Sequence, residues 1–429
     1  MENQSDCNSK LKSDPRLLTV WIVALTVVTA FCLLLPSVAT ATTTYYRSIG
    51  NGGTLYSSGS ATCNQDSTTV TFTGTLPADV GVGDKLSLDA DGSPGPTGEY
   101  YILNRVDDQE VTLQSPCTKT YQSSDSTDDF QIDRAYASFS GASGWETSRQ
   151  RDLTAATGDD SIEVAVCYKD SGPISEQVEI FGWTTGPNNY IRVWVPAGQR
   201  HNGIAGAGFA LKWNGTGTNV QLFEINEEYV RIEGIEIDGS LANAPGIRGI
   251  YTKNVSNTDS DIRIDKVLVH DITKNNSETN QFEGFGIYIS DGMAQITNSI
   301  VYNITNNNTN ATATVIGIDF NAGTSSSYNN TVYKVVNNGS DVAARGLWRE
   351  SGSVTVTNTY VGGTSGTTSY DFSGTMTANY NISSDDTADD NGGTDNLINH
   401  AAYDDSPACP GPSSDCIIFQ SIDSGTEDF

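Results

Sequence analysis

Four side chains that can take up or release a proton recur at a fixed interval in the second half of the sequence. Asp238, His270, Tyr302 and Lys334 are each separated by 32 residues. If each interval is one turn of a repeating strand structure, these four side chains stack in one outward row. Such a row could abstract a proton beside a uronate carboxylate, which is the step that a polysaccharide lyase needs. A solvated polar face of this composition is the alternative interpretation.

A second set combines aromatic rings with carboxylates. Short phrases that begin with Gly-Ile or a related pair are each followed by an aligned outward position. These positions hold Tyr251, Tyr288, Asp319, Trp348 and Asp371. Because sugar rings stack on aromatic rings and carboxylates accept hydrogen bonds from sugar hydroxyls, we predict a strip that binds an extended glycan. Ordinary cross-strand packing of exposed aromatic residues is the alternative.

The elements that would position both sets are short strands. Aligning the phrases around Ile232, Ile264, Ile296, Tyr328, Val356 and Thr377 gives intervals of 32, 32, 32, 28 and 21 residues. A second phrase interleaves with the first, as GIYT, GIYI, GIDF, GLWR and SYDF. Two alternating strand phrases at such a period indicate a solenoid. We interpret the changing interval as loop insertions at one place in an otherwise constant coil.

Aligned asparagines accompany the repeat. Asn298, Asn330, Asn358 and Asn379 fall at one position of the aligned phrases. Stacked Asn side chains can hydrogen-bond to one another along a turn, so we predict an internal Asn ladder with a structural role.

The composition excludes several partners. The chain has 429 residues, a formal net charge of −29 and a pI of about 4.2. Nucleic acids and anionic membranes would be repelled by such a surface. Abundant Gly, Ser, Thr, Asn and Asp favour turns and short strands over helices.

The N-terminus is typical of a secreted protein. Basic residues precede an apolar run, and Ala39-Thr40-Ala41 fits the rule for signal cleavage, so we expect export, with an uncleaved anchor as the alternative. Disulfides are then permitted, and Cys63–Cys117 and Cys409–Cys416 are the plausible pairs. Cys167, inside an apolar strand, is predicted to be a buried free thiol.

We expect five segments along the chain. They are a signal peptide (1–41), a small β module (42–135), a capping helix region (136–160), a parallel β-helix (161–384) and an acidic tail (385–429). The helix is expected over about 144–156, where Trp145 and Leu153 could cover an open end of the solenoid. Because no capping element is visible in the final residues, we expect that the sequence is truncated there.

The strand–turn–Asn phrases with their Gly-Ile starts, over about 160–384, resemble the right-handed parallel β-helix of pectin-lyase-like proteins. The phrases GVGDKL, YYILNRV, IEVAVCY and GQRHNG are similar to the leading part of large secreted bacterial β-helix proteins of uncertain function. The resemblance implies an all-β fold, with ligands along an outward sheet face or in a cleft walled by the long loops.

Catalytic patterns of that fold are largely missing. Its galacturonan hydrolases carry a paired-Asp motif, a Gly-His-Gly and an Arg-x-Lys, whereas this chain has only His201, His270 and His400 and no Gly-His-Gly. The stretch from Asp385 offers oxygen ligands but lacks calcium-loop spacing, so we predict no cofactor, with calcium as the alternative. We therefore predict a secreted polysaccharide-binding protein without an assigned reaction, with a lyase or glycoside hydrolase, or a structural adhesin, as alternatives.

Overall fold

The computed structural model describes residues 42–88, 98–122, 130–274, 282–309, 313–339, 343–390 and 393–400, together with the backbone of 402–403 and 417–418. The expected signal peptide and the expected Cys409–Cys416 disulfide lie outside these residues. None of the helices in the described ranges is long and apolar enough to cross a bilayer.

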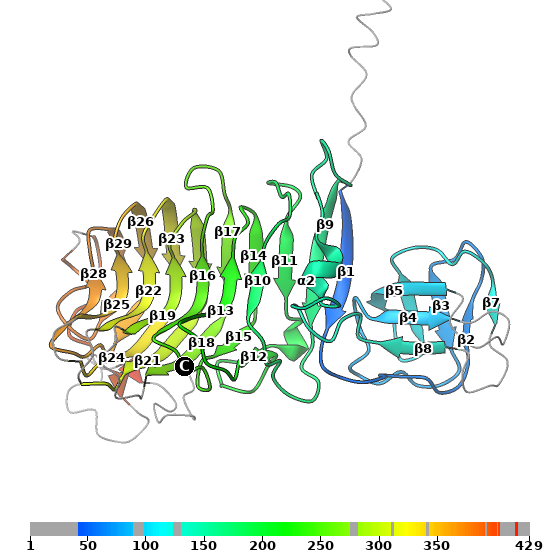
Figure 1. Cartoon of the computed structure of the whole chain (residues 1–429), viewed down its shortest axis with the longest axis horizontal. Helices are drawn as coiled ribbons and strands as arrows, with labels where there is room; N and C mark the ends of the chain where they lie inside the picture. Colours follow the sequence, from blue (N-terminus) through cyan, green and yellow to red (C-terminus); the bar gives the residue numbers. More distant parts are fainter. Residues whose placement is uncertain are drawn as a thin grey trace, which may run out of the picture. The chain divides into compact units, whose positions relative to one another are not determined.

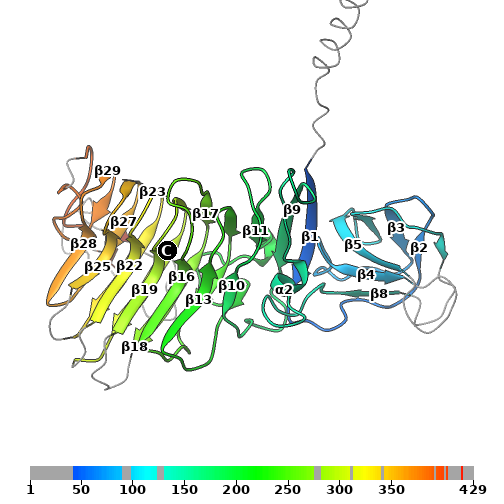
Figure 2. The ribbon, with the colours of Figure 1, turned by 45° about the horizontal axis from the view of Figure 1, so that its top comes forward.

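Three parallel sheets form the main body of the chain (Figures 1 and 2). Sheet I contains, in spatial order, β1 (Thr43–Ile49), β9 (Ser161–Cys167), β11 (Ile191–Trp194), β14 (Val230–Glu233), β17 (Ile262–Asp265), β20 (Ala294–Thr297), β23 (Thr324–Tyr328), β26 (Ser353–Thr357) and β29 (Thr377–Asn379). Sheet II contains β10 (Val178–Ile180), β13 (Asn219–Ile225), β16 (Gly246–Thr252), β19 (Phe282–Ile289), β22 (Ala313–Phe320), β25 (Ala343–Arg349) and β28 (Thr368–Ser373). Sheet III contains β12 (Ala210–Leu211), β15 (Glu236–Asp238), β18 (Leu268–Lys274), β21 (Ile300–Asn306), β24 (Thr331–Asn337), β27 (Tyr360–Gly362) and β30 (Ile382–Ser383).

Each coil visits the sheets in the order I, III, II and then pairs with the next coil in the same three sheets. Alternating apolar residues fill the interior, because successive side chains of a strand point to opposite faces. Ile232, Ile264 and Ile296 stack in register at the core of sheet I and are fully or almost fully buried. This arrangement confirms the predicted all-β solenoid.

The register departs from the sequence alignment after Ile296. The partner of Ile296 in the next coil is Ser327, and not Tyr328, so this coil is one residue shorter than the alignment assumed. Since side chains alternate between faces, a slip of one residue exchanges inward and outward positions. The alignment is correct again at Val356, which pairs with Ser327. A separate slip of one residue in the last coil places Ala378, and not Thr377, beside Val356.

The predicted Asn ladder exists with two of its four predicted members, Asn298 and Asn358, and with Asn329 between them. Asn298, Asn329 and Asn358 occupy the turn between sheets I and III with φ of 51°, 56° and 55°, and Asn tolerates this left-handed backbone better than most residues. Asn329 Nδ2 donates to Asn298 Oδ1 at 3.2 Å, and Asn358 Nδ2 donates to Asn329 Oδ1 at 3.2 Å. The ladder is exposed, so the predicted interior placement is wrong.

Asn330 and Asn379 do not belong to that ladder. Asn330 is buried one residue farther along, where its Oδ1 accepts the Ser299 N–H at 2.8 Å. The side chain of Asn379 bonds to Thr394 instead, because its oxygen accepts the Thr394 N–H at 3.1 Å. The short coil after Ile296 explains the error at Asn330.

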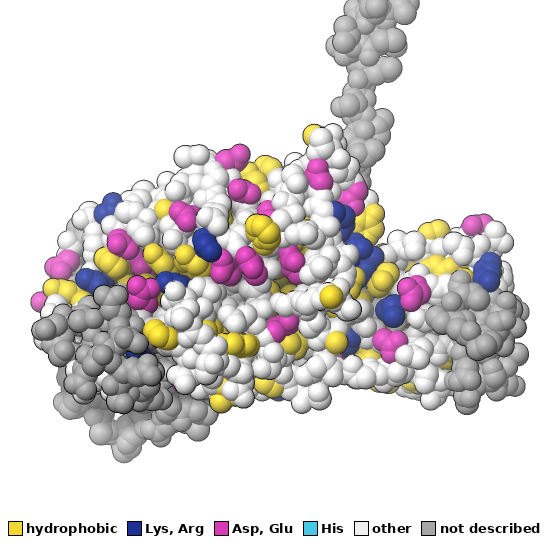
Figure 3. Space-filling model, in the orientation of Figure 1, with side chains coloured by type: hydrophobic (Ala, Val, Ile, Leu, Met, Phe, Trp, Pro, Cys, Tyr) yellow, Lys and Arg dark blue, Asp and Glu magenta, His cyan; other side chains and the backbone are white. Residues whose placement is uncertain are grey.

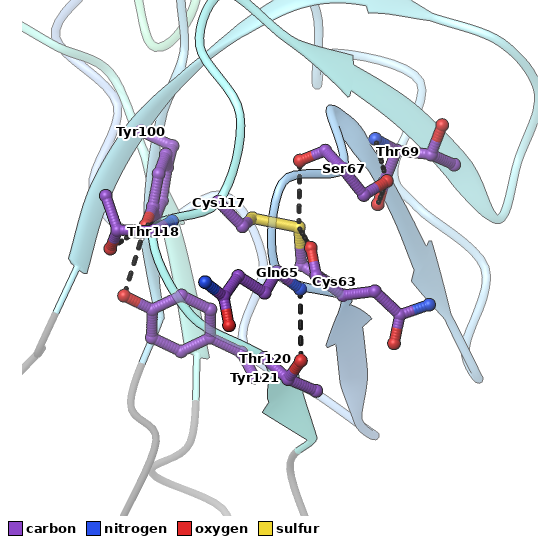
Figure 4. The surroundings of a disulfide bond; sticks show 10 residues. Cys63, Gln65, Ser67, Thr69, Tyr100, Cys117, Thr118, Thr120 and Tyr121 are labelled. Atoms are coloured by element: carbon purple, nitrogen blue, oxygen red, sulfur yellow. Dashed lines mark hydrogen bonds between the residues drawn. A yellow bond between two sulfur atoms is a disulfide. The ribbon is translucent and has the colours of Figure 1, made fainter.

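A seven-stranded antiparallel module lies between β1 and the rest of the solenoid in the sequence. Its strands are, in spatial order, β7 (Tyr121–Gln122), β2 (Ala61–Cys63), β3 (Thr69–Phe72), β6 (Glu110–Leu113), β5 (Gly98–Arg105), β4 (Lys85–Leu88) and β8 (Phe130–Asp133). Cys63 and Cys117 form the predicted disulfide in its buried core (Figure 4). The strand β1, which the sequence placed in this module, instead pairs with β9 of sheet I.

The helix α2 (Trp145–Arg149) is shorter than predicted and ends where Gln150 leaves helical backbone angles. Trp145 and Leu153 are fully buried in the solenoid core. Trp145 stacks on Trp183 with ring centroids 5.5 Å apart. The remaining short elements are η1 (Ala197–Gln199) and the pair β31 (Ala402–Tyr403) and β32 (Ile417–Ile418). Cys167 is a buried free thiol, as predicted.

Candidate functional site

Sheet III brings three of the four predicted proton-transfer residues into one row. Asp238 pairs in register with His270, and His270 pairs with Tyr302. The next residue in the row is Tyr333, because the coil after Tyr302 has the shorter length. Lys334 lies one position farther on with a φ of 55°, so the predicted fourth member of the row is misplaced.

This row faces away from the solenoid interior but is buried. His270 is 1% exposed and Tyr302 is fully buried, with their rings stacked 5.1 Å apart. His270 Nε2 lies 3.1 Å from Glu236 Oε1, and His270 Nδ1 lies 2.9 Å from Asp271 Oδ2. Burial by itself would lower the pKa of His270, but the hydrogen bonds to Asp271 and Glu236 and the charge of Asp238 raise this pKa to about 9. A ring that is already protonated at neutral pH is a poor general base.

One group of metal-type ligands occurs in the described part of the chain. A carboxylate oxygen of Glu236, one of Asp238 and a ring nitrogen of His270 all lie within 4.8 Å of one another. Lys212 Nζ lies 2.6 Å from Asp238 Oδ2, and the Gly206 N–H donates to both oxygens of Glu236. A cation at this position would have to displace the imidazole proton and the lysine.

In the stretch beginning at Asp385, the alternative calcium site, the first carboxylate is hydrogen-bonded within the protein. Asp385 accepts the Asp371 N–H at 2.9 Å and the Thr387 N–H at 3.0 Å. These bonds tie the segment to the last coil of the solenoid.

Sheet II carries the predicted aromatic strip. Tyr251, Tyr288, Asp319 and Trp348 are partners in successive coils, at a spacing of about 4.8 Å per coil. Tyr251 and Tyr288 are half-buried and stack with ring centroids 5.4 Å apart. The column continues to Ser373.

Asp371 therefore does not belong to the strip. It is 1% exposed and accepts hydrogen bonds from the Ser384 N–H and hydroxyl, each at 2.6 Å. Burial and the charge of Asp385 raise the pKa of Asp371 to about 6, against the lowering effect of the Ser384 bonds. The GIDF-type alignment failed here because the SYDF phrase is displaced in register by two residues.

A neighbouring outward column on sheet II was missed by the sequence alignment. It runs in register through Gln221, Arg248, Phe285, Ile316, Arg345 and Tyr370. Phe285 stacks on Tyr288 with centroids 4.5 Å apart, and the Arg345 guanidinium lies 4.1 Å from the Trp348 ring centroid. The two columns together make a surface of rings framed by arginines. The sequence did contain a signal for this second column, because residues alternate between inward and outward positions in the phrases GIRGIYT and FGIYI.

Asp319 is unusual within the strip because it is 1% exposed, and among the described residues neither of its carboxyl oxygens has a hydrogen-bond partner. Burial and the charge of Glu350 raise the pKa of Asp319 to about 8, although Arg345 lowers it. Asp319 therefore holds a neutral carboxyl group between Tyr288 and Trp348 at pH 7.

A cavity of about 400 Å³ opens at the first coils of sheet II. Glu179 and Glu224, which line it, are the partners that continue the strip from Tyr251 toward β10. Glu146 of α2 lines the same cavity. On the face shown in Figure 3, hydrophobic and acidic side chains gather in a band over the region where Figure 1 labels β22, β16 and β10.

The three glutamates of this cavity have different surroundings. Glu146 Oε1 accepts the Trp183 indole N–H at 2.8 Å and the Phe181 N–H at 3.1 Å. Burial raises the pKa of Glu146, with a further rise from the charge of Glu179, although these two bonds lower it. Lys253 Nζ lies 3.3 Å from Glu224 Oε1. The sequence offered one signal for the pair on the sheet, which is the outward Glu in the phrases QVEI and LFEI.

Neither a family model nor a curated protein matches the sequence. Among solved structures, the chain is similar to the tailspike protein gp49 from Pseudomonas phage LKA1, with 10% identity and a TM-score of 0.16 over 84% of this chain and 68% of that one. It is also similar to the catalytic domain of a GH87 alpha-1,3-glucanase in complex with tetrasaccharides, with 10% identity and a TM-score of 0.16 over 76% of this chain and 69% of that one. At these scores the likeness carries no argument about function. The fold is established by the chain's own three parallel sheets.

Proposed function

We propose that this protein binds a polysaccharide along the outward face of sheet II. The observation that carries the proposal is the register of Tyr251, Tyr288 and Trp348 in one column, which leads to the glutamate-lined cavity. Rings at intervals of one or two coils suit the flat faces of successive sugar units, and aromatic side chains contribute large contact areas at low entropic cost.

Polar groups beside the rings would fix the orientation of the sugars. Glu179 and Glu224 can accept hydrogen bonds from hydroxyls, whereas Arg248 can donate them. Binding sites of this kind combine apolar surface with a few placed polar groups. The mixture on sheet II therefore suits a hydroxylated chain better than a hydrocarbon or a bare polyanion.

An extracellular setting fits this proposal. The Cys63–Cys117 disulfide is of the kind that persists in oxidising compartments. Together with the expected signal peptide, it supports secretion, where free polysaccharides and cell-surface glycans are accessible.

A glycan array with the full mature chain tests the proposal. The variants Tyr288→Ala and Trp348→Ala should each weaken binding of the captured glycan by up to roughly tenfold, since stacking on one ring contributes on the order of 1 kcal/mol. Tyr380→Asn is the matched control, because Tyr380 is 54% exposed outside the strip and has the positive φ that Asn holds in earlier coils. Equal loss in the control, or no captured glycan, would refute the proposal.

Glycoside hydrolysis is the second candidate, favoured by one observation. Glu146, with its raised pKa, lines the same cavity as Glu179 and Glu224, and a pair of carboxyl groups in different environments is what acid-assisted hydrolysis requires. Incubation of the bound glycan followed by reducing-end and unsaturated-product assays separates the candidates. New reducing ends that Glu146→Gln abolishes indicate a hydrolase, unsaturated ends indicate a lyase, and binding without product supports the first proposal. A structural adhesin is indicated if neither binding nor product is seen.

A further inference from the structure

A second cavity, of about 350 Å³, lies on the outward face of sheet I. Three of its lining residues are Arg192, Arg231 and Arg263, with Tyr190 and Gln295 beside them. It belongs to a different sheet from the aromatic strip, so it is independent of the function proposed above.

The arginines are stacked in one row. Arg192 pairs with Arg231, Arg231 with Arg263, and Arg263 with Gln295, each one coil from the next, at about 4.8 Å. The whole chain contains 23 basic and 52 acidic residues. A row of three arginines on one sheet face is therefore a local reversal of the chain's charge.

Among the residues that the structure describes, the carboxylates around the row are too few to neutralise it. Arg192 and Arg200 both bind Glu233, which is thus shared. Arg263 Nη2 lies 2.8 Å from Asp261, and Arg231 Nη2 lies 3.9 Å from the same carboxylate. Four guanidinium groups consequently share two carboxylates.

A third carboxylate at the cavity, Asp265, has partners of its own. Lys266 Nζ pairs with it, and Thr297 Oγ1 donates to Asp265 Oδ1 at 2.7 Å. The positive charge of Lys266 cancels the negative charge of Asp265. This pair therefore leaves the excess of positive charge at the arginines unchanged.

Arg231 is the central and least neutralised member of the row. Its guanidinium lies 3.5 Å from the centroid of the Tyr190 ring, which holds the side chain in place. Burial lowers the pKa of Arg231, and the charges of Arg263 and Arg192 lower it further, against the opposing effects of Tyr190 and Asp261. Its side chain is still 26% exposed, so it is accessible from the cavity.

We propose that this cavity binds the oxyanion of a small hydroxylated ligand, a carboxylate or phosphate ester of a sugar, with Arg231 as the central anchor. Guanidinium groups match the geometry of carboxylate and phosphate oxygens. Gln295 and Thr297, which also line the cavity, supply neutral polar groups for the ligand's hydroxyls. The cavity's volume suits a single sugar unit or the end of a chain.

Calorimetric titration of the full mature chain tests this site with four probes, which are glucuronate, glucose 6-phosphate, inorganic phosphate and glucose. We expect one or both charged sugars to bind, with an affinity that falls as salt is added, and to bind better than phosphate alone. Comparison of the two charged sugars distinguishes a carboxylate from a phosphate ester. Glucose should not bind detectably.

Variants locate the binding. Arg231→Gln should weaken binding of the charged sugar by about tenfold or more, which is the contribution of one charged hydrogen bond. The affinity of Arg231→Lys should lie between those of the parent and Arg231→Gln, because lysine keeps the charge and loses the planar fork. Arg263→Gln, at a side chain that is 49% exposed, gives a second reading if Arg231→Gln does not fold. Lys85→Gln removes the same charge in the antiparallel module and should have no effect.

Three results would overturn the proposal. They are unchanged affinity in both the Arg231 and the Arg263 variants, binding of phosphate as tight as that of either charged sugar, and no binding of any probe at millimolar concentration. If this proposal fails, the proposed glycan binding on sheet II is not affected, because Tyr288→Ala and Trp348→Ala test that face alone.

Discussion

Glu179 and Glu224 accept hydrogen bonds from the same amide group. Asn226 Nδ2 lies 2.8 Å from Glu179 Oε1 and 3.0 Å from Glu224 Oε1. The two side chains are partners in neighbouring strands of sheet II, where like charges directly opposite one another repel. Asn226 therefore offsets a repulsion that the register imposes, and it holds two carboxylates toward one cavity.

Replacing this amide should disturb the cavity more than the fold. Asn226→Leu removes the shared donor, so the two glutamates should move apart. We expect the free energy of unfolding to fall by about 1–2 kcal/mol at pH 7. Denaturant titration of the variant beside the parent measures this, and an unchanged free energy of unfolding would contradict it.

Asp319 predicts a stability that falls with rising pH. Its folded pKa of about 8 lies above the ordinary value of 3.8, so the folded protein holds a proton that the unfolded chain releases. This penalty is absent below pH 4 and grows as pH rises to about 8. Asp319→Asn keeps the shape without the charge, and it should be more stable than the parent at pH 8 by on the order of 5 kcal/mol. Chemical denaturation at pH 4.5 and pH 8 tests this; a variant that is less stable than the parent at pH 8 would contradict it.

The ion pairs of His270 predict a loss of stability in a different pH range. Its folded pKa of about 9 exceeds the ordinary 6.5, so its ion pairs with Glu236 and Asp271 contribute fully below pH 6.5 and fade as pH rises through 9. His270→Gln should cost on the order of 3 kcal/mol at pH 6 and less at pH 9.5. Proton NMR of the ring gives a direct check, and a ring that titrates near 6.5 would refute the ion-pair role.

Arg134 predicts a coupling between the antiparallel module and the solenoid. Its side chain is 2% exposed and bonds to Asp84 at 2.8 Å and to Asp170 at 2.7 Å. Removing one partner of a buried ion pair leaves uncompensated charge and costs about 3–5 kcal/mol. Arg134→Met should therefore lower the melting temperature and expose the segment around Asp170 to proteolysis, whereas Arg105→Met, in the module alone, should leave that segment protected.

The repeat was predictable from sequence where its period was constant. Ile232, Ile264 and Ile296 are separated by equal intervals, and the structure stacks them as expected. The next coil is one residue shorter, and nothing in the local phrases marks which residue is missing. That single omission misplaced Lys334 and Asn330, because each strand residue faces opposite to its neighbour.

The candidate site was predictable only in part for the same reason. Tyr251, Tyr288 and Asp319 follow Gly-Ile pairs, Trp348 follows Gly-Leu, and all four align correctly. Glu146 comes from a helix far from the repeats in sequence, so no interval could connect it to Glu224. The row of Arg192, Arg231 and Arg263 was not predicted, because the repeat is recognisable from the apolar residues of the same phrases.

The early strand β1 has a consequence for how the chain is built. Ser48 and Gly50, at its end, exchange backbone hydrogen bonds with Tyr136, so the chain leaves the solenoid and re-enters it at almost one point. The antiparallel module is thus a domain inserted into a continuous coil. Evolution, or an engineer, could exchange this inserted domain for another one while the coil stays closed.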